Sequence, residues 1–296
     1  MLAPGSRIGD YTLLRRAGIG ATSEVYEGRH VGTGRTVAVK VLHDEWCLHL
    51  EVVARFLNEA HALQHIQHPR IVTVFACGAL PEGPPFMILE WLPMDLERAL
   101  AHAGGTFPAP SAARVASQVA EALAALHDLG IVHRDLKPAN VLLAQEEIAG
   151  TEVKLADLGL AKVLPEEATA RTPGMATSIC AVPVSTGGNA LLGTWEYMAP
   201  EQWIRAKDVD PKADVYALGA LLFQMLTGRP PFVGGQQKDL MCFHLFEPPP
   251  LHLLDGLLAP SGRSLVAAML SKKPSLRPVM REVMARLGEV AGASFV

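Results

Sequence analysis

The 296-residue sequence predicts an α+β fold with a mainly β first part and a larger, mainly α second part. Three observations predict this class. Strand-and-turn patterns occupy residues 11–42 and two apolar runs lie at residues 70–78 and 85–92, whereas apolar residues recur at helical spacing beyond residue 96. Hydrophobic residues make up 49% of the chain and charged residues 19%, a balance that is typical of packed globular proteins. We expect the change from sheet to helix to fall at residues 90–95.

The first part is expected to hold five strands and one helix. Valine occupies every second position in the stretch TVAVKVL at residues 36–42, which is the period of a half-buried strand. Apolar residues recur every three or four positions from Leu50 to Leu63, which predicts an amphipathic helix. It must end by His68, because Pro69 disfavours helix before it. The other strands are predicted over residues 11–16, 24–30, 70–78 and 85–92.

The second part is expected to be helical. Val115, Val119 and Leu123 share one side of a predicted helix over residues 111–129, and Gly130 is its stop signal. Residues 165–190 are rich in Ala, Thr, Ser, Gly and Pro without periodicity, which predicts a long mobile loop. Further helices are predicted from Pro211, Leu240, Ser261 and Val279.

Charge and cysteine usage argue against several classes of function. A net charge of −4 gives no general basic field, so we expect no nucleic-acid partner. The four cysteines form no CxxC pair, which argues against a disulfide framework or a zinc site and suits a reducing cytosol. The apolar run at residues 217–226 is about half a membrane span. We therefore expect a cytoplasmic protein with no membrane segment in this chain.

The stretch GIGATSEV at residues 18–25 is a candidate phosphate-binding loop. Taken alone, it is equally well explained as a plain turn. A dinucleotide-binding loop leads from a strand into a helix, whereas a strand is predicted on each side of this one. The loop is therefore expected at the tip of a hairpin, where glycines let backbone N–H groups approach the phosphates of a nucleoside triphosphate.

The stretch HRDLKPAN at residues 133–140 concentrates polar groups that a core would not contain. Five of its residues match the catalytic loop of phosphotransferases: His133, Arg134, Asp135, Lys137 and Asn140. At about 5% usage per residue type, the chance of such a match in a chain of this length is about 10⁻⁴. The stretch therefore indicates phosphoryl transfer.

Several independent motifs occur in one order: the glycine loop, VAVK, a helix glutamate, HRDLKPAN, DLG, GTWEYMAPE and DVYALG. Through these motifs the chain resembles eukaryotic-type (Hanks-type) serine/threonine protein kinases. The sequences of stretches such as RFLNEA, HPRIV and LGTWEYMAPEQW are similar to those of bacterial members. The resemblance runs over residues 9–290. It implies the bilobal protein kinase fold across residues 1–296, with an N-lobe at 9–89, a hinge at 90–95, a C-lobe at 96–290 and an activation segment at 157–201.

The resemblance implies transfer of the γ-phosphate of ATP to Ser and Thr hydroxyls of proteins, as in a non-specific serine/threonine protein kinase. Lys40 would contact the α- and β-phosphates and Glu59 would hold it by an ion pair. Asp135 would accept the proton of the substrate hydroxyl, and Lys137 would lie on the γ-phosphate. Thr194 would bridge Asp135 and Lys137.

The same resemblance implies ATP and Mg²⁺ as cofactors, with Mn²⁺ as an alternative ion. Asn140 and Asp157 would hold the metal, since carboxylate and amide oxygens suit Mg²⁺. Leu89 would be the gatekeeper beside the adenine. The implied nucleotide-binding residues are Gly18, Ile19, Gly20, Ser23, Val25, Ala38, Lys40, Leu89, Glu90, Leu92 and Leu142.

Two further sets of residues follow from the resemblance. Glu201 and Arg277 would form a buried ion pair, and Asp214 would brace the catalytic loop from a helix. Kinases of this kind are commonly activated when a phosphate in the activation segment pairs with the arginine that corresponds to Arg134. The candidate autophosphorylation sites are Thr186 and Ser185, with Thr177 and Ser178 as weaker candidates.

Other interpretations stay open at this point. The chain could be a pseudokinase or a nucleotide-binding signalling scaffold, although every catalytic position is present. A small-molecule phosphotransferase is a third class, but those enzymes generally lack GTWEYMAPE. His61, His65 and His68 could form a metal face, and we favour instead a helix end followed by a turn. A stand-alone kinase, a kinase fragment of a longer receptor and a homodimer are not distinguished.

Overall fold

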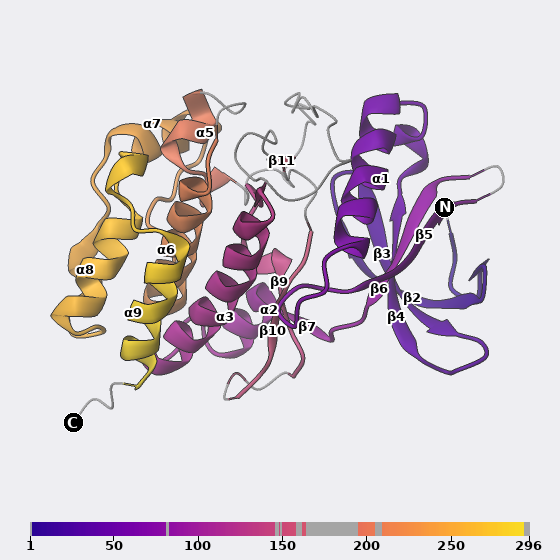
Figure 1. Ribbon diagram of the computed structural model, residues 1–296, viewed down its shortest axis with the longest axis horizontal. Coiled ribbons are helices and arrows are strands. Elements are labelled where there is room, and N and C mark those ends of the chain that lie inside the picture. The colour runs from indigo at the N-terminus through magenta and orange to yellow at the C-terminus, as the bar shows by residue number, and fades with distance from the viewer. Residues whose placement is uncertain are drawn as a thin grey trace. The chain divides into compact units, whose positions relative to one another are not determined.

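The computed structural model describes residues 2–80, 83–145, 148, 150–157, 162–163, 195–204 and 209–292 (Figure 1). The backbone divides into two units, Met1–Pro93 and Met94–Val296. The first unit is built around one sheet, and the second is mainly helical. The two units therefore have different kinds of core, and each is described by itself.

The first unit holds a six-stranded antiparallel sheet in the order β1-β2-β3-β4-β6-β5. Its strands are β1 (Arg7–Ile8), β2 (Tyr11–Ile19), β3 (Ser23–His30), β4 (Thr36–Leu42), β5 (Val74–Ala79) and β6 (Pro85–Glu90). Because side chains alternate along a strand, Val37, Val39 and Val41 of β4 all face one side. They are buried there with Leu13 and Ile88. The opposite side carries Ala38 and Lys40.

Helix α1 (Leu50–Gln64) packs on the sheet through a second cluster of apolar side chains. Phe56 and Ala60 of α1 are buried against Leu42 of β4 and Met87 of β6. A short 3₁₀ turn, η1 (Asp44–Trp46), connects β4 to α1. Figure 1 shows α1 crossing the strands of the unit. This packing fixes the face of α1 that points toward Lys40.

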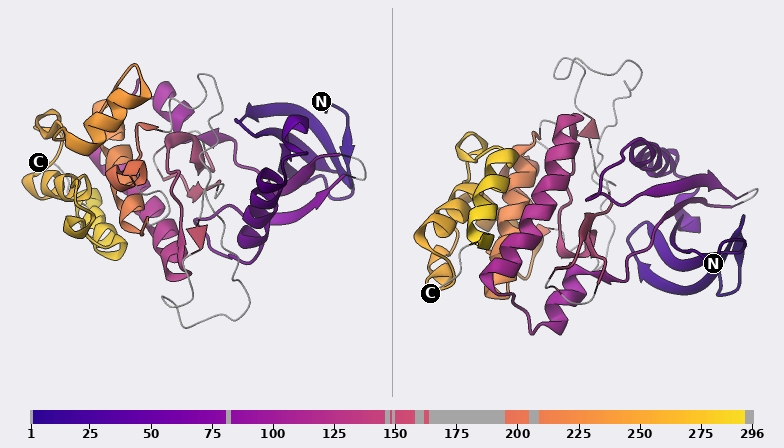
Figure 2. Two further views of the ribbon diagram at one scale, coloured as in Figure 1. Left: turned by 90° about the horizontal axis from the view of Figure 1, so that it is seen from above. Right: turned by 60° about the horizontal axis from the view of Figure 1, so that its bottom comes forward.

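The second unit is built around α6 (Lys212–Thr227), whose residues from Ala213 to Phe223 are all buried. Helices α3 (Ala109–Asp128) and α9 (Met280–Gly292) contact each other and α6, and they lie side by side in Figures 1 and 2. The other helices described are α2 (Leu96–His102), α5 (Pro200–Ile204), α7 (Gln237–Phe246) and α8 (Pro260–Met269). The 3₁₀ turns are η2 (Pro138–Asn140), η6 (Leu251–Leu254) and η7 (Pro274–Leu276).

Short strands in the second unit position the stretch HRDLKPAN. A three-stranded sheet has the order β10-β9-β7, and β11 pairs with β8. The strands are β7 (Met94–Asp95), β8 (Ile131–Val132), β9 (Val141–Leu143), β10 (Val153–Leu155) and β11 (Lys162–Val163). The stretch begins directly after β8 and ends directly before β9. Its two ends are therefore fixed by β-pairing.

The predicted α+β class is confirmed. The long predicted elements occur, with boundaries that differ at some ends: β5 begins at Val74 rather than at residue 70, and α7 begins at Gln237 rather than at Leu240. Helix α2 was not predicted, and its N-terminus is capped by Asp95, whose side chain accepts from the N–H of Arg98 at 2.8 Å. The loop predicted at residues 165–190 lies outside the described residues. Among the helices that are described, none combines the length and apolar character that crossing a bilayer requires.

Candidate active site

The glycine loop of the first unit is the turn between β2 and β3. Gly20 closes it by donating its N–H to the carbonyl oxygen of Ser23 at 2.7 Å, and a Cβ at Gly20 would lie 3.2 Å from that same oxygen. A Cβ at Gly18 would point into open space. Ser23 is buried, whereas Ile19 is 63% exposed. The space beside Gly18 is open, which leaves room for a phosphate to approach the backbone there.

Lys40 forms an ion pair with Glu59 of α1, with its Nζ 3.0 Å from Oε1. Both side chains are largely buried, at 12% and 6% exposure, so the pair has little competition from water. Lys40 is opposite Val25 on β3, and Ala38 is opposite Leu89 on β6. Cross-strand partners share a face. Val25, Ala38, Lys40 and Leu89 therefore lie on one side of the sheet.

The chain leaves β6 at Glu90. The backbone N–H of Glu90 donates to the carbonyl oxygen of Thr73 at 2.9 Å, and its side-chain Oε2 accepts from the N–H of Thr73 at 3.3 Å. Leu92 is buried. Glu90 is therefore held by the backbone of Thr73, the residue directly before β5. Its N–H already donates a hydrogen bond within the first unit.

Asp135 of the second unit is held between Lys137 and Asn140. Its Oδ2 accepts from Nζ of Lys137 at 2.8 Å and from Nδ2 of Asn140 at 3.2 Å. Asn140 Nδ2 also donates to the carbonyl oxygen of Asp135 at 2.8 Å. The other carboxylate oxygen, Oδ1, is buried and has no hydrogen-bond partner among the described residues. One oxygen is thus fixed by cationic and amide donors, while the other can accept a further proton donor.

The backbone just before Asp135 is strained and held by a buried acid. Arg134 has φ 68°, a conformation that costs free energy for a residue with a Cβ. Asp214 of α6 offsets this cost, because its two oxygens accept from the N–H groups of His133 and Arg134, both at 2.9 Å. The predicted bracing role of Asp214 is confirmed.

Asp214 also accepts from His127 Nε2 at 2.7 Å, and it is completely buried. Burial alone would raise the pKa of this carboxyl. The hydrogen bond and the charge of His127, together with the N–H of Arg134, lower the pKa of Asp214 below its ordinary value. The carboxylate that supports the backbone before Asp135 is therefore kept ionised.

Asn140 and Asp157 lie at one end of the hairpin formed by β9 and β10. Val141 is opposite Leu155, and the N–H of Ala156 donates to the carbonyl oxygen of Asn140 at 2.9 Å, so Asp157 follows one residue further on. Asp157 has φ 64°, which turns the chain at this point. Because Nδ2 of Asn140 donates to Asp135, the other atom of this amide, Oδ1, is the one that can bind a metal ion. The two positions offer an amide and a carboxylate oxygen, a donor set that fits Mg²⁺.

Glu201 of α5 and Arg277 form the predicted ion pair, and this prediction is confirmed. The pair is bidentate, with distances of 2.5 Å from Nη1 to Oε1 and 2.8 Å from Nη2 to Oε2. The Arg277 side chain is fully buried and also donates to the carbonyl oxygens of Ser271 and Lys212, each at 2.8 Å. The pair ties α5 to the segment after α8.

The structure describes one of the six remaining predicted site residues, Leu142. Leu142 lies on β9, opposite Lys154 and Asp95. Five predicted residues lie outside the described residues: Thr177, Ser178, Ser185, Thr186 and Thr194. His61 and His65 are joined by a hydrogen bond from Nδ1 of His65 to the carbonyl oxygen of His61 at 2.7 Å, as in a helix end.

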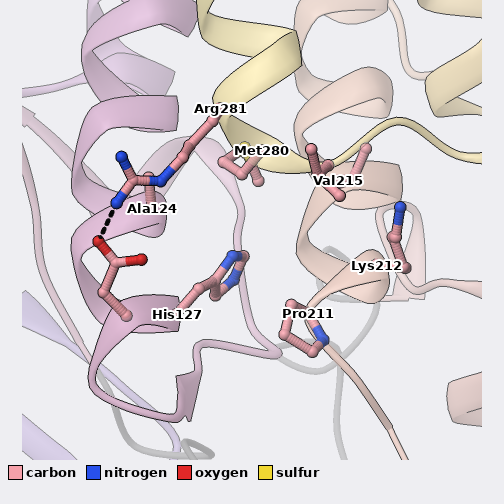
Figure 3. A pocket seen from close by; sticks show the side chains of 9 residues that line it. Ala124, His127, Pro211, Lys212, Val215, Met280 and Arg281 are labelled. Atoms are coloured by element: carbon pink, nitrogen blue, oxygen red, sulfur yellow. Dashed lines mark hydrogen bonds and ion pairs between the residues drawn. The ribbon is translucent and has the colours of Figure 1, made fainter.

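Sequence reasoning missed His127 and Gln202. His127 lies in the last turn of α3 and lines a cavity of about 200 Å³ between α3, the start of α6 and α9 (Figure 3). Gln202 donates from Nε2 to the carbonyl oxygen of Arg134 at 2.9 Å. Neither residue lies in a recognisable motif of its own. A histidine near the end of a predicted helix, just upstream of HRDLKPAN, was the one available signal.

Comparisons with known proteins identify the family. The sequence model of the family described as "protein kinase domain" matches residues 11–287, so the chain belongs to this family. It is 39% identical over 274 residues to serine/threonine-protein kinase Pkn1 of Myxococcus xanthus, covering 92% of this chain and 37% of that protein. It is 32% identical over 265 residues to serine/threonine-protein kinase PknB of Mycobacterium leprae, covering 88% of this chain and 39% of that protein.

These relatives confirm the predicted resemblance to bacterial serine/threonine protein kinases. A third relative, serine/threonine-protein kinase pkn2 of Myxococcus xanthus, is 35% identical over 289 residues, which is 94% of this chain and 32% of that protein. The chain thus spans 32% to 39% of the length of these three relatives.

Proposed function

We propose that this chain is the catalytic domain of a serine/threonine protein kinase, which transfers the γ-phosphate of Mg-ATP to Ser and Thr hydroxyls of proteins. The observation that carries the proposal is the arrangement around Asp135. Its Oδ2 is fixed by Lys137 and Asn140, and its buried Oδ1 is left to accept from a hydroxyl. The relatives are named as serine/threonine-protein kinases, which supports this choice of substrate.

The transfer step follows from these groups. The substrate hydroxyl oxygen forms a bond to the γ-phosphorus while the bond to the bridging oxygen of ADP breaks, and the hydroxyl proton passes to Asp135 Oδ1. Lys137 neutralises charge on the γ-phosphate oxygens. General-base assistance of this kind is typically worth about 10²–10⁴-fold. Thr194 would contact both Asp135 and Lys137 and so bridge them.

The nucleotide-binding residues in the first unit have complementary roles. Lys40, oriented by Glu59, binds the α- and β-phosphates, and the backbone at Gly18, Ile19, Gly20 and Ser23 covers them. Val25, Ala38 and Leu89 contact the adenine, as does Leu142 of the second unit. Glu90 offers its carbonyl oxygen and Leu92 its N–H, since the N–H of Glu90 already donates to Thr73.

Asn140 and Asp157 would hold Mg²⁺, or Mn²⁺ in its place. A divalent ion bound there neutralises phosphate charge during transfer. Asn140 has a second role in this chain, because its Nδ2 restrains Asp135 from both the backbone and the side chain.

We also propose a domain layout and a means of activation. The N-lobe comprises residues 9–89, the hinge 90–95, the C-lobe 96–290 and the activation segment 157–201. Autophosphorylation at Thr186 or Ser185 supplies a phosphate for Arg134, and Thr177 and Ser178 are weaker candidates for the same role. Nε of Arg134 is buried without a partner among the described residues, which supports its pairing with a phosphate group added by autophosphorylation.

Cys47, Cys77 and Cys242 are free thiols, which fits a cytoplasmic protein. Homodimerisation is left as a hypothesis.

The proposal is tested by incubating the protein with γ-labelled ATP, Mg²⁺ and a generic basic protein, then identifying the labelled amino acids. We expect phosphoserine and phosphothreonine but no phosphotyrosine. Nucleotide binding is measured in parallel. Tight binding with no label in any protein would instead support the pseudokinase or scaffold interpretation. Mass spectrometry of residues 160–192 then shows whether the proposed autophosphorylation sites carry phosphate.

A further inference from the structure

The tip of the glycine loop is held by side chains from the segment that follows β4. The backbone N–H of His43 donates to the carbonyl oxygen of Thr22 at 2.9 Å. The imidazole Nε2 of His43 lies 3.1 Å from the carbonyl oxygen of Gly20, and Nε1 of Trp46 donates to that of Ala21 at 3.3 Å. Three successive carbonyl groups of the loop thus point toward one short segment, His43–Trp46, which we call the latch.

The latch determines where the loop amides point. In a trans peptide the C=O and the following N–H point in opposite directions. When the carbonyl groups of Gly20, Ala21 and Thr22 face the latch, the N–H groups of Ala21, Thr22 and Ser23 face away from it. The N–H groups of Ala21 and Thr22 donate to no other group among the described residues. Adjacent N–H groups turned to one side form a site for anionic oxygens.

The latch is itself anchored. Trp46 and Cys47 pack against the apolar cluster of Leu42, Phe56, Ala60 and Met87, which joins β4 and β6 to α1. His43 is oriented from its other side by Glu24, whose Oε1 lies 3.9 Å from Nδ1 of His43. Glu24 is buried and also accepts from the hydroxyl of Tyr26 and from Arg16. Because the carbonyl oxygen of Gly20 can only accept, Nε2 of His43 is the donor in this contact.

We propose that His43 and Trp46 are positioning residues for the triphosphate, which hold the loop amides in the direction that the phosphates require. This inference rests on the proposed function, because it assigns the latch to the same nucleotide. It extends that function by naming two residues that belong to no kinase motif in the sequence. Their contribution is to binding of ATP rather than to the transfer step.

The test compares Trp46→Phe, His43→Leu and the double variant with wild type. Trp46→Phe removes the N–H donor and keeps a ring in the apolar cluster. His61→Gln is the control, since His61 is an exposed histidine of the same unit on α1. We expect each single variant to raise both the Kd for Mg-ATP and the KM for ATP about three- to tenfold, as for one hydrogen bond. At saturating ATP, kcat should stay within about twofold of wild type.

Hydrogen exchange of the ATP-free protein gives a second readout. The amide of Gly20, which closes the loop by donating to the carbonyl oxygen of Ser23, should exchange faster in the latch variants and at the wild-type rate in His61→Gln. Unchanged Kd and unchanged exchange in the double variant would overturn the proposal. So would a fall in kcat with KM unchanged, which would place the effect of the two residues on the transfer step and not on ATP binding. A wild type that binds Mg-ATP but transfers no phosphate would contradict the proposed function alone, because the Kd comparison still tests the latch.

Discussion

Asp214 shows how one buried side chain can support the backbone at the start of the stretch HRDLKPAN. It accepts hydrogen bonds from His127, His133 and Arg134 and lies on α6, a helix that is itself buried on nearly all sides. The strained backbone at Arg134 would relax without it, since a left-handed conformation persists only where the surroundings impose it. The position of Asp135 therefore depends on a residue that lies 79 positions further along the chain, on α6.

The first prediction concerns this carboxylate. Asp214→Asn replaces one acceptor oxygen with an N–H₂ group that faces existing donors. We expect a loss of about 1–3 kcal/mol in the free energy of unfolding and a fall in kcat of about tenfold or more. Urea unfolding and steady-state kinetics measure the two effects. Asp255→Asn, an exposed acid paired with Arg263, is the control and should change stability by no more than about 0.5 kcal/mol.

At the scale of elements, the ion pair of Glu201 and Arg277 joins α5 to the segment after α8. Removing one partner leaves a buried charge uncompensated, which is strongly destabilising. We expect Glu201→Ala to cost about 3 kcal/mol or more in the free energy of unfolding. The matched control is Asp128→Ala, because Asp128 pairs with Arg281 at 2.6 Å but both side chains are exposed, at 56% and 74%. That variant should lose no more than about 1 kcal/mol. Equal losses in the two variants would contradict this account of the buried pair.

The elements differ in how far the sequence could predict them. Strand β4 and helix α1 were predictable because their apolar periods are unambiguous. Helix α2 is only Leu96–His102, too short for a clear period, so its capping residue Asp95 was the one local signal. The sequence also could not show why α6 carries Gly219. A Cβ there would lie 2.8 Å from Cβ of Met269 on α8, which depends on packing between distant segments.

The candidate site divides in the same way. Asp135, Lys137 and Asn140 could be predicted, since they lie within one short stretch whose residue types are tied to the chemistry. Contacts made by isolated residues could not be predicted. His43, Trp46 and His127 are three such residues. Each acts through a hydrogen bond to a residue that is distant in sequence, so no local pattern marks it.

For the molecule as a whole, His244 should make stability depend on pH. It is fully buried on α7, and its Nδ1 lies 2.9 Å from the hydroxyl of Tyr216. Burial and the charge of Lys272 lower its pKa to about 3, from an ordinary value of 6.5. The unfolded chain therefore binds a proton before the folded one does. Stability from this group is complete above pH 6.5 and is lost as the pH falls toward 3, by up to about 1.4 kcal/mol per pH unit.

This dependence can be isolated with His244→Phe. Trp203 is stacked near His244, with ring centroids 6.3 Å apart, so tryptophan fluorescence reports on this region during urea unfolding. Wild type should be the more stable protein at pH 7.5, and its advantage should shrink as the pH is lowered to 5. An advantage that stays constant over this range would mean that His244 is not the source of the dependence.

The most direct test of phosphoryl transfer by this domain is the rate of label transfer from γ-labelled ATP for wild type and Asp135→Asn at saturating Mg-ATP. We expect the variant to bind the nucleotide as tightly as wild type while its kcat falls by about 10²–10⁴-fold. Equal rates for the two proteins would contradict the assignment of Asp135 as the proton acceptor.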